Sequence, residues 1–199
     1  MALLGVLGGT YDPPHHGHLA AAEEARYRLG LDRVLWVPVG DPPHKRHRAI
    51  TPAAHRIAMV RAAVADNRAF EVSDVELRRA GPSYTVDTLD QLRVERSLDS
   101  LVFLMGSDEF SVLSTWYQAE RLPELAHLGV LIRSGARLNV ERTERELPGV
   151  QGRYTLVPVP SLPISSSSLR ERVREGLPIR YLVPEPVREY IEMHRLYER

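Results

Sequence analysis

The sequence predicts an α/β protein with a doubly wound, Rossmann-like parallel sheet and helices on both faces. Short apolar segments recur along the 199 residues, helical patterns alternate with them, and Gly, Pro or Ser residues mark most boundaries. Strands that alternate with helices favour a parallel sheet because each parallel neighbour requires a crossover connection. At this length we expect one domain that spans residues 1–199.

The expected strands are apolar, rich in β-branched residues and too short to be helices. They are Leu3–Leu7, Val34–Val39, Leu101–Met105, Val130–Ile132 and Tyr154–Val159. A sixth and weaker strand is expected within Phe70–Leu77. The stretch Ser134–Arg153 is rich in Gly, Arg and Glu, and we expect it to be irregular.

Capping residues indicate where the helices begin and end. Gly30 follows the helical pattern Leu19–Leu29 and is expected to act as its C-terminal cap. Thr51 suits the N-cap of the next helix and Pro52 its first helical position. Further helices are expected over Val86–Val94, Glu109–Trp116, Ser167–Glu175 and Pro186–Leu196.

Composition excludes several classes of protein. Apolar residues make up 43% and charged residues 26% of the chain, which is typical of a globular protein. The formal net charge is zero, so a broad basic surface for nucleic acid is not indicated. The chain has no cysteine, which excludes disulfides and thiol nucleophiles. The apolar N-terminus Met1–Leu7 is too short for a signal peptide or membrane span, so we expect a cytoplasmic protein without a membrane partner.

The loop after the first strand contains the clearest candidate site. Ligands of such sheets bind beyond the carboxyl ends of the strands, and Gly8, Gly9 and Thr10 occupy that position here. Glycines let a backbone approach a ligand closely. His15 and His18 follow, three residues apart at a helix start, where they can share one face and the helix dipole favours anions. These residues predict a phosphate site whose geometry differs from the GxGxxG and Walker motifs, which are absent.

Two other interpretations of these histidines are open. One is a helix-capping turn with surface imidazoles, which a single histidine would favour. The other is a zinc site formed by His15, His16 and His18, but there is no HExxH pattern and no obvious acidic or cysteine partner. We therefore predict no metal-ligating side chain.

The loop after the second strand contains Lys45, the single lysine among 26 basic residues. The chain uses arginine elsewhere, and an ammonium differs from a guanidinium because it is a compact and mobile point charge. A phosphate contact is the favoured interpretation of Lys45, and a solvated basic loop is the alternative.

Two later strands are also followed by candidate residues. Asp108 follows Leu101–Met105 and could bind ribose hydroxyls or a Mg²⁺ shell, or simply cap the next helix. Trp116 is either a core residue or a stacking platform for a flat heterocycle. After the last strand, serines such as Ser166 and the nearby Arg170 can converge on one anion at a helix start, although plain N-capping is the alternative.

Five segments together resemble bacterial nicotinate-nucleotide adenylyltransferases, which belong to the nucleotidyltransferase superfamily marked by HxGH and ISSTxxR. They are GGTYDPPHHGH, PVGDPPHK, SYTVDTL, GSDEFSVLSTW and ISSSSLR. HxGH alone would indicate only the superfamily, but the ordered set matches nearly end to end. Tyr11 stands where phenylalanine is usual, Pro14 where an aliphatic residue is usual, and Ser167 where threonine is usual. None of these departures removes a phosphate ligand.

The resemblance implies adenylyl transfer from ATP to nicotinate mononucleotide with Mg²⁺ as cofactor. The implied catalytic residues are His15, His18, Lys45 and Arg170. The implied ATP-binding residues are Gly8, Gly9, Thr10, His15, His18, Asp108, Ser165, Ser166 and Arg170. The implied pyridine mononucleotide site contains Thr85, Trp116, Tyr117 and Lys45.

Three alternatives are open at this stage. The acceptor could be nicotinamide mononucleotide, or the enzyme could use both mononucleotides. A non-catalytic nucleotide sensor is a second alternative, disfavoured because it would not need His15, His18, Lys45 and Arg170 together. A nucleic-acid-binding module is a third, disfavoured by the zero net charge. The sequence does not give the oligomeric state, so a homo-oligomer is also open.

Overall fold

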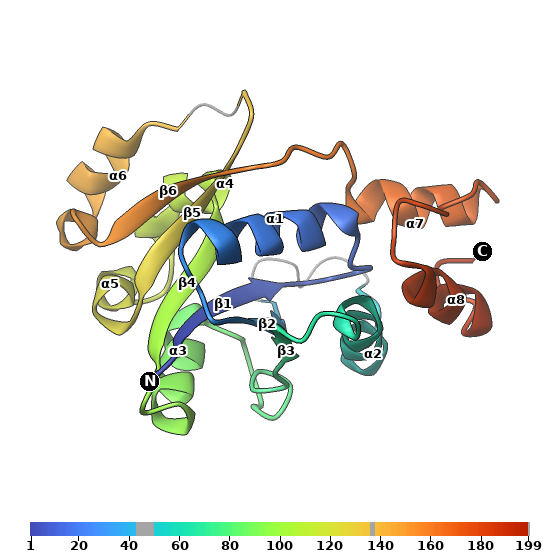
Figure 1. Ribbon diagram of the computed structural model, residues 1–199, viewed down its shortest axis with the longest axis horizontal. Helices are drawn as coiled ribbons and strands as arrows, with labels where there is room; N and C mark the ends of the chain where they lie inside the picture. The colour runs from blue at the N-terminus through green and yellow to red at the C-terminus, as the bar shows by residue number, and fades with distance from the viewer. Residues whose placement is uncertain (43–49, 136–137, 199) are drawn as a thin grey trace.

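A parallel sheet forms the centre of the computed structural model, which describes residues 1–42, 50–135 and 138–198. Within the described residues the sheet has six strands in the order β3-β2-β1-β4-β5-β6 (Figure 1). The strands are β1 Leu3–Gly9, β2 Arg33–Pro38, β3 Phe70–Val72, β4 Ser100–Gly106, β5 His127–Arg133 and β6 Tyr154–Val159. This order confirms the predicted doubly wound fold.

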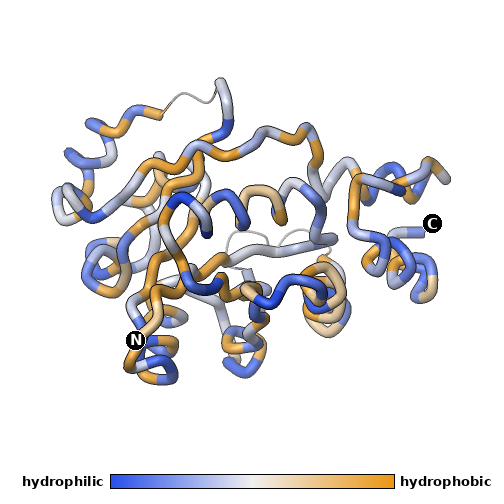
Figure 2. The backbone as a smooth tube through the Cα atoms, viewed as in Figure 1, coloured by the Kyte–Doolittle hydropathy of each residue, from blue (hydrophilic) through white to orange (hydrophobic). Residues whose placement is uncertain are grey.

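Helices connect the strands and cover both faces of the sheet. They are α1 His16–Arg28, α2 Ala53–Val64, α3 Thr85–Glu95, α4 Ser107–Ser111, α5 Leu122–Leu125, α6 Val140–Glu146, α7 Ser166–Arg174 and α8 Glu185–Met193. Figure 1 shows α7 and α8 at one end of the molecule, away from α5 and α6. Figure 2 shows hydrophilic and hydrophobic residues alternating along α7 and α8, as expected when one side of a helix is packed. In the described residues, no helix has both the length and the apolarity needed to cross a lipid bilayer.

Side chains of alternate strand residues enter two separate cores. In β2, Trp36 joins the core that contains α1, α2 and α8, whereas Leu35 and Val37 join the core that contains α3 and α4. The same alternation in β4 sends Leu104 to the first core and Phe103 to the second. Because successive strand side chains point to opposite faces, a sheet covered on both faces needs apolar residues throughout, and these runs supply them.

Several predicted boundaries are confirmed or move by a few residues. Gly30 has a φ of +62° directly after the last turn of α1, the left-handed conformation that a C-terminal glycine cap requires. The N-cap of α2 is Pro52, so the expectation that Thr51 caps this helix is wrong. The backbone of Thr51 is used elsewhere: its N–H donates to Asp12, and its carbonyl accepts from Arg56.

Three other expectations need correction. The strand expected over Phe70–Leu77 ends at Val72, because turn hydrogen bonds join Leu77 and Arg78 to the carbonyl of Asp74. The helix expected from Glu109 to Trp116 is α4 followed by a separate 3-10 turn at Leu113–Thr115. The stretch Ser134–Arg153 is not irregular throughout, since Asn139 caps α6 by accepting from Arg142 N–H.

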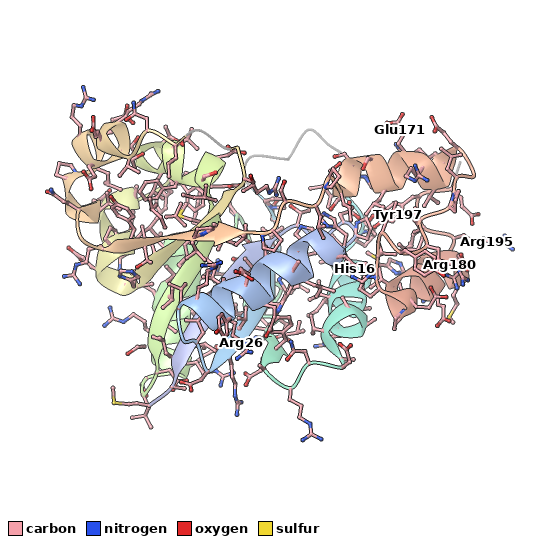
Figure 3. All side chains as sticks on the ribbon, turned by 45° about the horizontal axis from the view of Figure 1, so that its top comes forward. His16, Arg26, Glu171, Arg180, Arg195 and Tyr197 are labelled. Atoms are coloured by element: carbon pink, nitrogen blue, oxygen red, sulfur yellow. The ribbon has the colours of Figure 1, made fainter. Side chains whose placement is uncertain are left out.

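The C-terminal helix α8 packs against α2 and carries the end of the chain back to the first loop. Val187 and Ile191 are its buried residues. Beyond the helix, the hydroxyl of Tyr197 donates to Asp12 Oδ1 at 2.7 Å. Figure 3 labels Tyr197 and His16, both at the end of the molecule where α1 begins. The C-terminal segment therefore supports the loop that the sequence analysis singled out.

Replacing Ile191 by alanine should lower the free energy of unfolding by about 2–5 kcal/mol, because Ile191 is only 2% exposed and its loss leaves a cavity. Met193, on the same helix but 77% exposed, provides the matched control. Urea unfolding of Ile191→Ala and Met193→Ala measures both changes. Equal destabilisation by the two substitutions would contradict the packing described here.

Candidate active site

Two cavities meet at the carboxyl end of β1. The larger has a volume of about 490 Å³ and the smaller about 210 Å³. Gly8, Gly9 and Thr10 line both of them. The last two residues of β1 and Thr10, which begins the first loop (residues 10–15), therefore form a shared wall, and ligands in the two cavities would approach each other across it.

His15 at the end of the first loop and His18 in α1 stack in the larger cavity. His15 is the N-cap of α1 and His18 lies in its first turn, with ring centroids 3.7 Å apart. The backbone N–H of His15 donates to Nδ1 of His18 at 3.2 Å. Because Nδ1 accepts this bond, neutral His18 must carry its proton on Nε2, which makes Nε2 a donor.

Burial keeps both imidazoles neutral at physiological pH. It lowers the pKa of His15 to about 4 and the pKa of His18 to about 3, from an ordinary value of 6.5. The charge of Arg133 contributes to both shifts, and His15 also lowers the pKa of His18. Nδ1 of His15 is buried without a hydrogen-bond partner among the described residues. An unpaired buried polar atom is costly, so a ligand that pairs with it would gain binding energy.

The start of α7 is tied to the first loop. Arg170 Nη1 donates to the carbonyl of Asp12 at 2.7 Å, and Ser166 Oγ donates to the carbonyl of Pro13 at 2.8 Å. Ser166, Ser167 and Arg170 line the larger cavity together with the histidines. The two sequence motifs therefore lie at one edge of the sheet, although the hydrogen-bonded Pro13 and Ser166 are 153 positions apart in the chain.

Other predicted residues take different positions. Asp108 lines the larger cavity at the start of α4, whose N-cap is Gly106, so the alternative that Asp108 caps this helix is wrong. Ser165 does not line the cavity; its hydroxyl accepts from the N–H of Ser168 and caps α7. Lys45 lies outside the described residues.

Sequence reasoning missed three residues of this region. Arg133 lines the larger cavity at the carboxyl end of β5, so the rule used for the other loops could have found it. Asp12 and Arg56 are 3% and 2% exposed, and both bond to backbone groups. Asp12 accepts from the N–H of Thr51, and Arg56 donates to the carbonyl of Thr10. Asp12 lies within the quoted segment GGTYDPPHHGH but was given no role, and no local pattern marked Arg56, because their partners lie far away in the chain.

The smaller cavity brings together the remaining predicted residues. Thr85, Trp116 and Tyr117 all line it. Trp116 stands edge-on to Phe103 at 6.2 Å between ring centroids, and Tyr84 contacts Tyr117 at 4.4 Å. Thr85 is the first residue of α3, where backbone N–H groups have no partner within the helix. Aromatic walls can stack a flat ring, and the start of a helix favours an anionic group near it.

Comparisons with known proteins agree with this geometry. The cytidylyltransferase-like family model matches residues 6–172. A probable nicotinate-nucleotide adenylyltransferase of Thermomicrobium roseum is 50% identical over 197 residues, which cover 99% of this chain and 92% of the relative. A relative with the same name from Roseiflexus sp. is 46% identical and 98% of each chain is covered.

Among solved structures, the Plasmodium falciparum nicotinic acid mononucleotide adenylyltransferase complexed with NaAD matches with a TM-score of 0.80. The match covers 99% of this chain and 98% of that chain at 19% identity. At this identity the likeness concerns the fold. It agrees with the six-stranded parallel sheet described above.

The low pKa values of the two imidazoles predict how the free protein responds to acid. In the folded state His15 and His18 should stay neutral down to about pH 4, whereas unfolded histidines take up protons near pH 6.5. Between these values the unfolded state binds more protons, so stability should fall as the pH is lowered through this window. Imidazole NMR, assigned with His15→Gln and His18→Gln, measures the midpoints. Midpoints at or above pH 6 for both rings would contradict the burial described here.

Proposed function

We propose that this protein transfers the AMP part of ATP to nicotinate mononucleotide. The premise is its family: the chain belongs to the cytidylyltransferase-like family and, within it, to the nicotinate-nucleotide adenylyltransferases. The observation that supports this most directly is the wall shared by the two cavities at Gly8, Gly9 and Thr10. ATP would occupy the larger cavity and the mononucleotide the smaller one. Their reacting phosphates would then meet at the first loop.

The reaction needs alignment and charge stabilisation rather than a protein nucleophile. A phosphate oxygen of the mononucleotide attacks the α-phosphorus of ATP, the bond from that phosphorus to the β-phosphate oxygen breaks, and pyrophosphate leaves. A phosphate monoester has a second pKa of about 6, so it is already anionic at neutral pH and requires no general base. The protein must hold the reactants in line and stabilise charge on the transferring and leaving oxygens.

The larger cavity supplies donors for that charge. We assign Nε2–H of His18 and the imidazole of His15 to phosphate oxygens, with the guanidinium of Arg170 beside them. Neutral imidazoles can donate without the cost of burying two like charges 3.7 Å apart. We also assign Arg133 to this cavity, where its positive charge would attract a triphosphate. Lys45 is retained as a proposed phosphate contact from its sequence position.

Mg²⁺ fits as an ion that arrives with ATP. Mg²⁺ usually keeps several waters and takes one or two carboxylates plus substrate phosphates. In the described parts of the chain no group of three or more His, Asp or Glu side chains is arranged to hold a metal. Asp108 and Glu109 offer carboxylates in the larger cavity, whereas both oxygens of Asp12 already accept hydrogen bonds from protein groups. When bound, Mg²⁺ would offset negative charge on the phosphate oxygens.

The start of α3 favours nicotinate over nicotinamide. Thr85, the first residue of this helix, lines the smaller cavity, and a helix N-terminus stabilises a carboxylate more than a neutral amide. Glu76 also lines this cavity, but burial raises the pKa of its carboxyl, which disfavours the anionic form. Trp116 or Tyr117 would contact the pyridine ring, either stacked on it or edge-on.

The function is tested by incubating the purified protein with ATP, Mg²⁺ and one pyridine mononucleotide at a time. We expect pyrophosphate and a dinucleotide in equal amounts with nicotinate mononucleotide, and a lower kcat/KM with nicotinamide mononucleotide. A higher kcat/KM with the amide would contradict the assigned acceptor. No dinucleotide from either substrate would contradict the proposed reaction itself.

His18→Ala should lower kcat by about 10²–10³-fold, since removing one donor to a developing charge typically costs that much. His16→Ala is the matched control, because His16 lies two residues before His18 in the same helix but does not line either cavity. Steady-state kinetics at saturating substrates, with circular dichroism to show that each variant is folded, measure the difference. A folded His18→Ala protein with near-normal kcat would remove this imidazole from the mechanism.

A further inference from the structure

Arg56 is a buried cation that lines neither cavity. It lies in the first turn of α2 and is 2% exposed, although arginine is almost never fully buried unless it is paired. The other arginines of the site, Arg133 and Arg170, line the larger cavity and can reach a ligand. The position of Arg56 therefore requires a separate explanation.

The guanidinium of Arg56 donates to three backbone carbonyls. Nε bonds the carbonyl of Thr51 at 2.9 Å, Nη1 that of Thr10 at 3.1 Å, and Nη2 that of Gly40 at 3.3 Å. A guanidinium holds its N–H donors in a rigid planar fork, so bonds from all three nitrogens fix the relative positions of their acceptors. A flexible lysine ammonium could not reproduce this geometry.

The three carbonyls belong to the segments that form the boundary of the two cavities. Thr10 lies in the wall that both cavities share. Gly40 follows β2, and Thr51 precedes α2 and gives its N–H to Asp12 of the first loop. Arg56 therefore joins the loop after β1 to the loop after β2.

Gly40 is held from its other side by the smaller cavity. Its N–H donates to the carboxyl of Glu76 at 3.3 Å, and Glu76 and Ser83 both line that cavity. A Cβ atom at position 40 would come within 2.6 Å of the Glu76 carbonyl and 2.9 Å of Ser83 Oγ. The loop after β2 is thus packed tightly between Arg56 and the wall of the smaller cavity.

The carboxylate of Asp12 partly offsets the cost of burying this guanidinium. Burial lowers the pKa of Arg56, while the negative charge of Asp12 favours its charged form. A buried charge that is hydrogen-bonded on several sides can be retained, whereas loss of the guanidinium would leave buried carbonyls unpaired. These hydrogen bonds are expected to hold the loops after β1 and β2 at a fixed separation.

We propose that Arg56 is a positioning residue that sets the spacing between the shared wall and the smaller cavity, and so aligns the two substrates for transfer. The proposal rests on the proposed function, because alignment matters only if two ligands react across the wall. Arg56 lines neither cavity and its three hydrogen bonds go to backbone carbonyls, so each substrate alone should bind almost as well without it. The joining step should suffer most, since a misplacement of about 1 Å can cost about 10²-fold in rate.

Arg56→Lys tests this inference, with Arg61→Lys on the exposed side of the same helix as the matched control. We expect Arg56→Lys to lower kcat by about 10²-fold, while calorimetric Kd values for ATP and for nicotinate mononucleotide each change less than about threefold. Arg61→Lys should match the wild type in every measurement. Each variant is assayed about 15 °C or more below its own thermal unfolding midpoint, so that only folded protein is compared.

A second variant separates positioning from general destabilisation. In Arg56→Ala, added guanidinium ion should fill the vacated space and raise kcat by at least about tenfold. The same concentration of ammonium ion should not raise kcat, because ammonium lacks the planar arrangement of donors. Arg56→Lys with wild-type kcat would overturn the proposal. So would a loss of binding as large as the loss of kcat, or failure of both variants to fold even with guanidinium. An inactive wild type would instead refute the proposed function.

Discussion

The parallel pairing of β1 on both of its edges is the constraint on which the site depends. Gly9 is in register with Pro38 of β2, and Leu7 with Leu104 of β4, so all three strands end at the same edge. Strand order reverses between β1 and β4, which sends the following connections to opposite sides of the sheet. The loop after β1 is therefore reached from both sides, and one short segment can form the wall of two cavities.

Buried polar contacts convert this topology into a defined shape. Asp12, Arg56 and Glu76 are each more than nine-tenths buried, and each bonds a backbone group of a loop that borders a cavity. Apolar packing alone would place the loops near one another without fixing their separation. Directed hydrogen bonds fix it, and they remain strong where water is excluded. Stability and catalysis thus draw on the same residues, although none of these three is proposed to touch a reacting atom.

The sequence predicted the features that local patterns encode. Apolar runs predicted the strands, and Gly30 predicted the end of α1. The spacing of His15 and His18 predicted that they share one face of the helix. The features that it did not predict depend on contacts between distant segments. Arg56 bonds a residue 46 positions away, and Tyr197 bonds one 185 positions away, so neither contact leaves a periodic signal. Helix α6 was missed because its charged sequence resembles a loop, whereas Thr143 is buried against Phe110.

A crystal structure with nicotinate adenine dinucleotide bound tests the central claim most directly. The account predicts the adenosine half in the larger cavity, the pyridine half between Thr85 and Trp116, and the pyrophosphate bridge against Gly8, Gly9 and Thr10. A dinucleotide with both halves in one cavity, or with its bridge away from the end of β1, would contradict it.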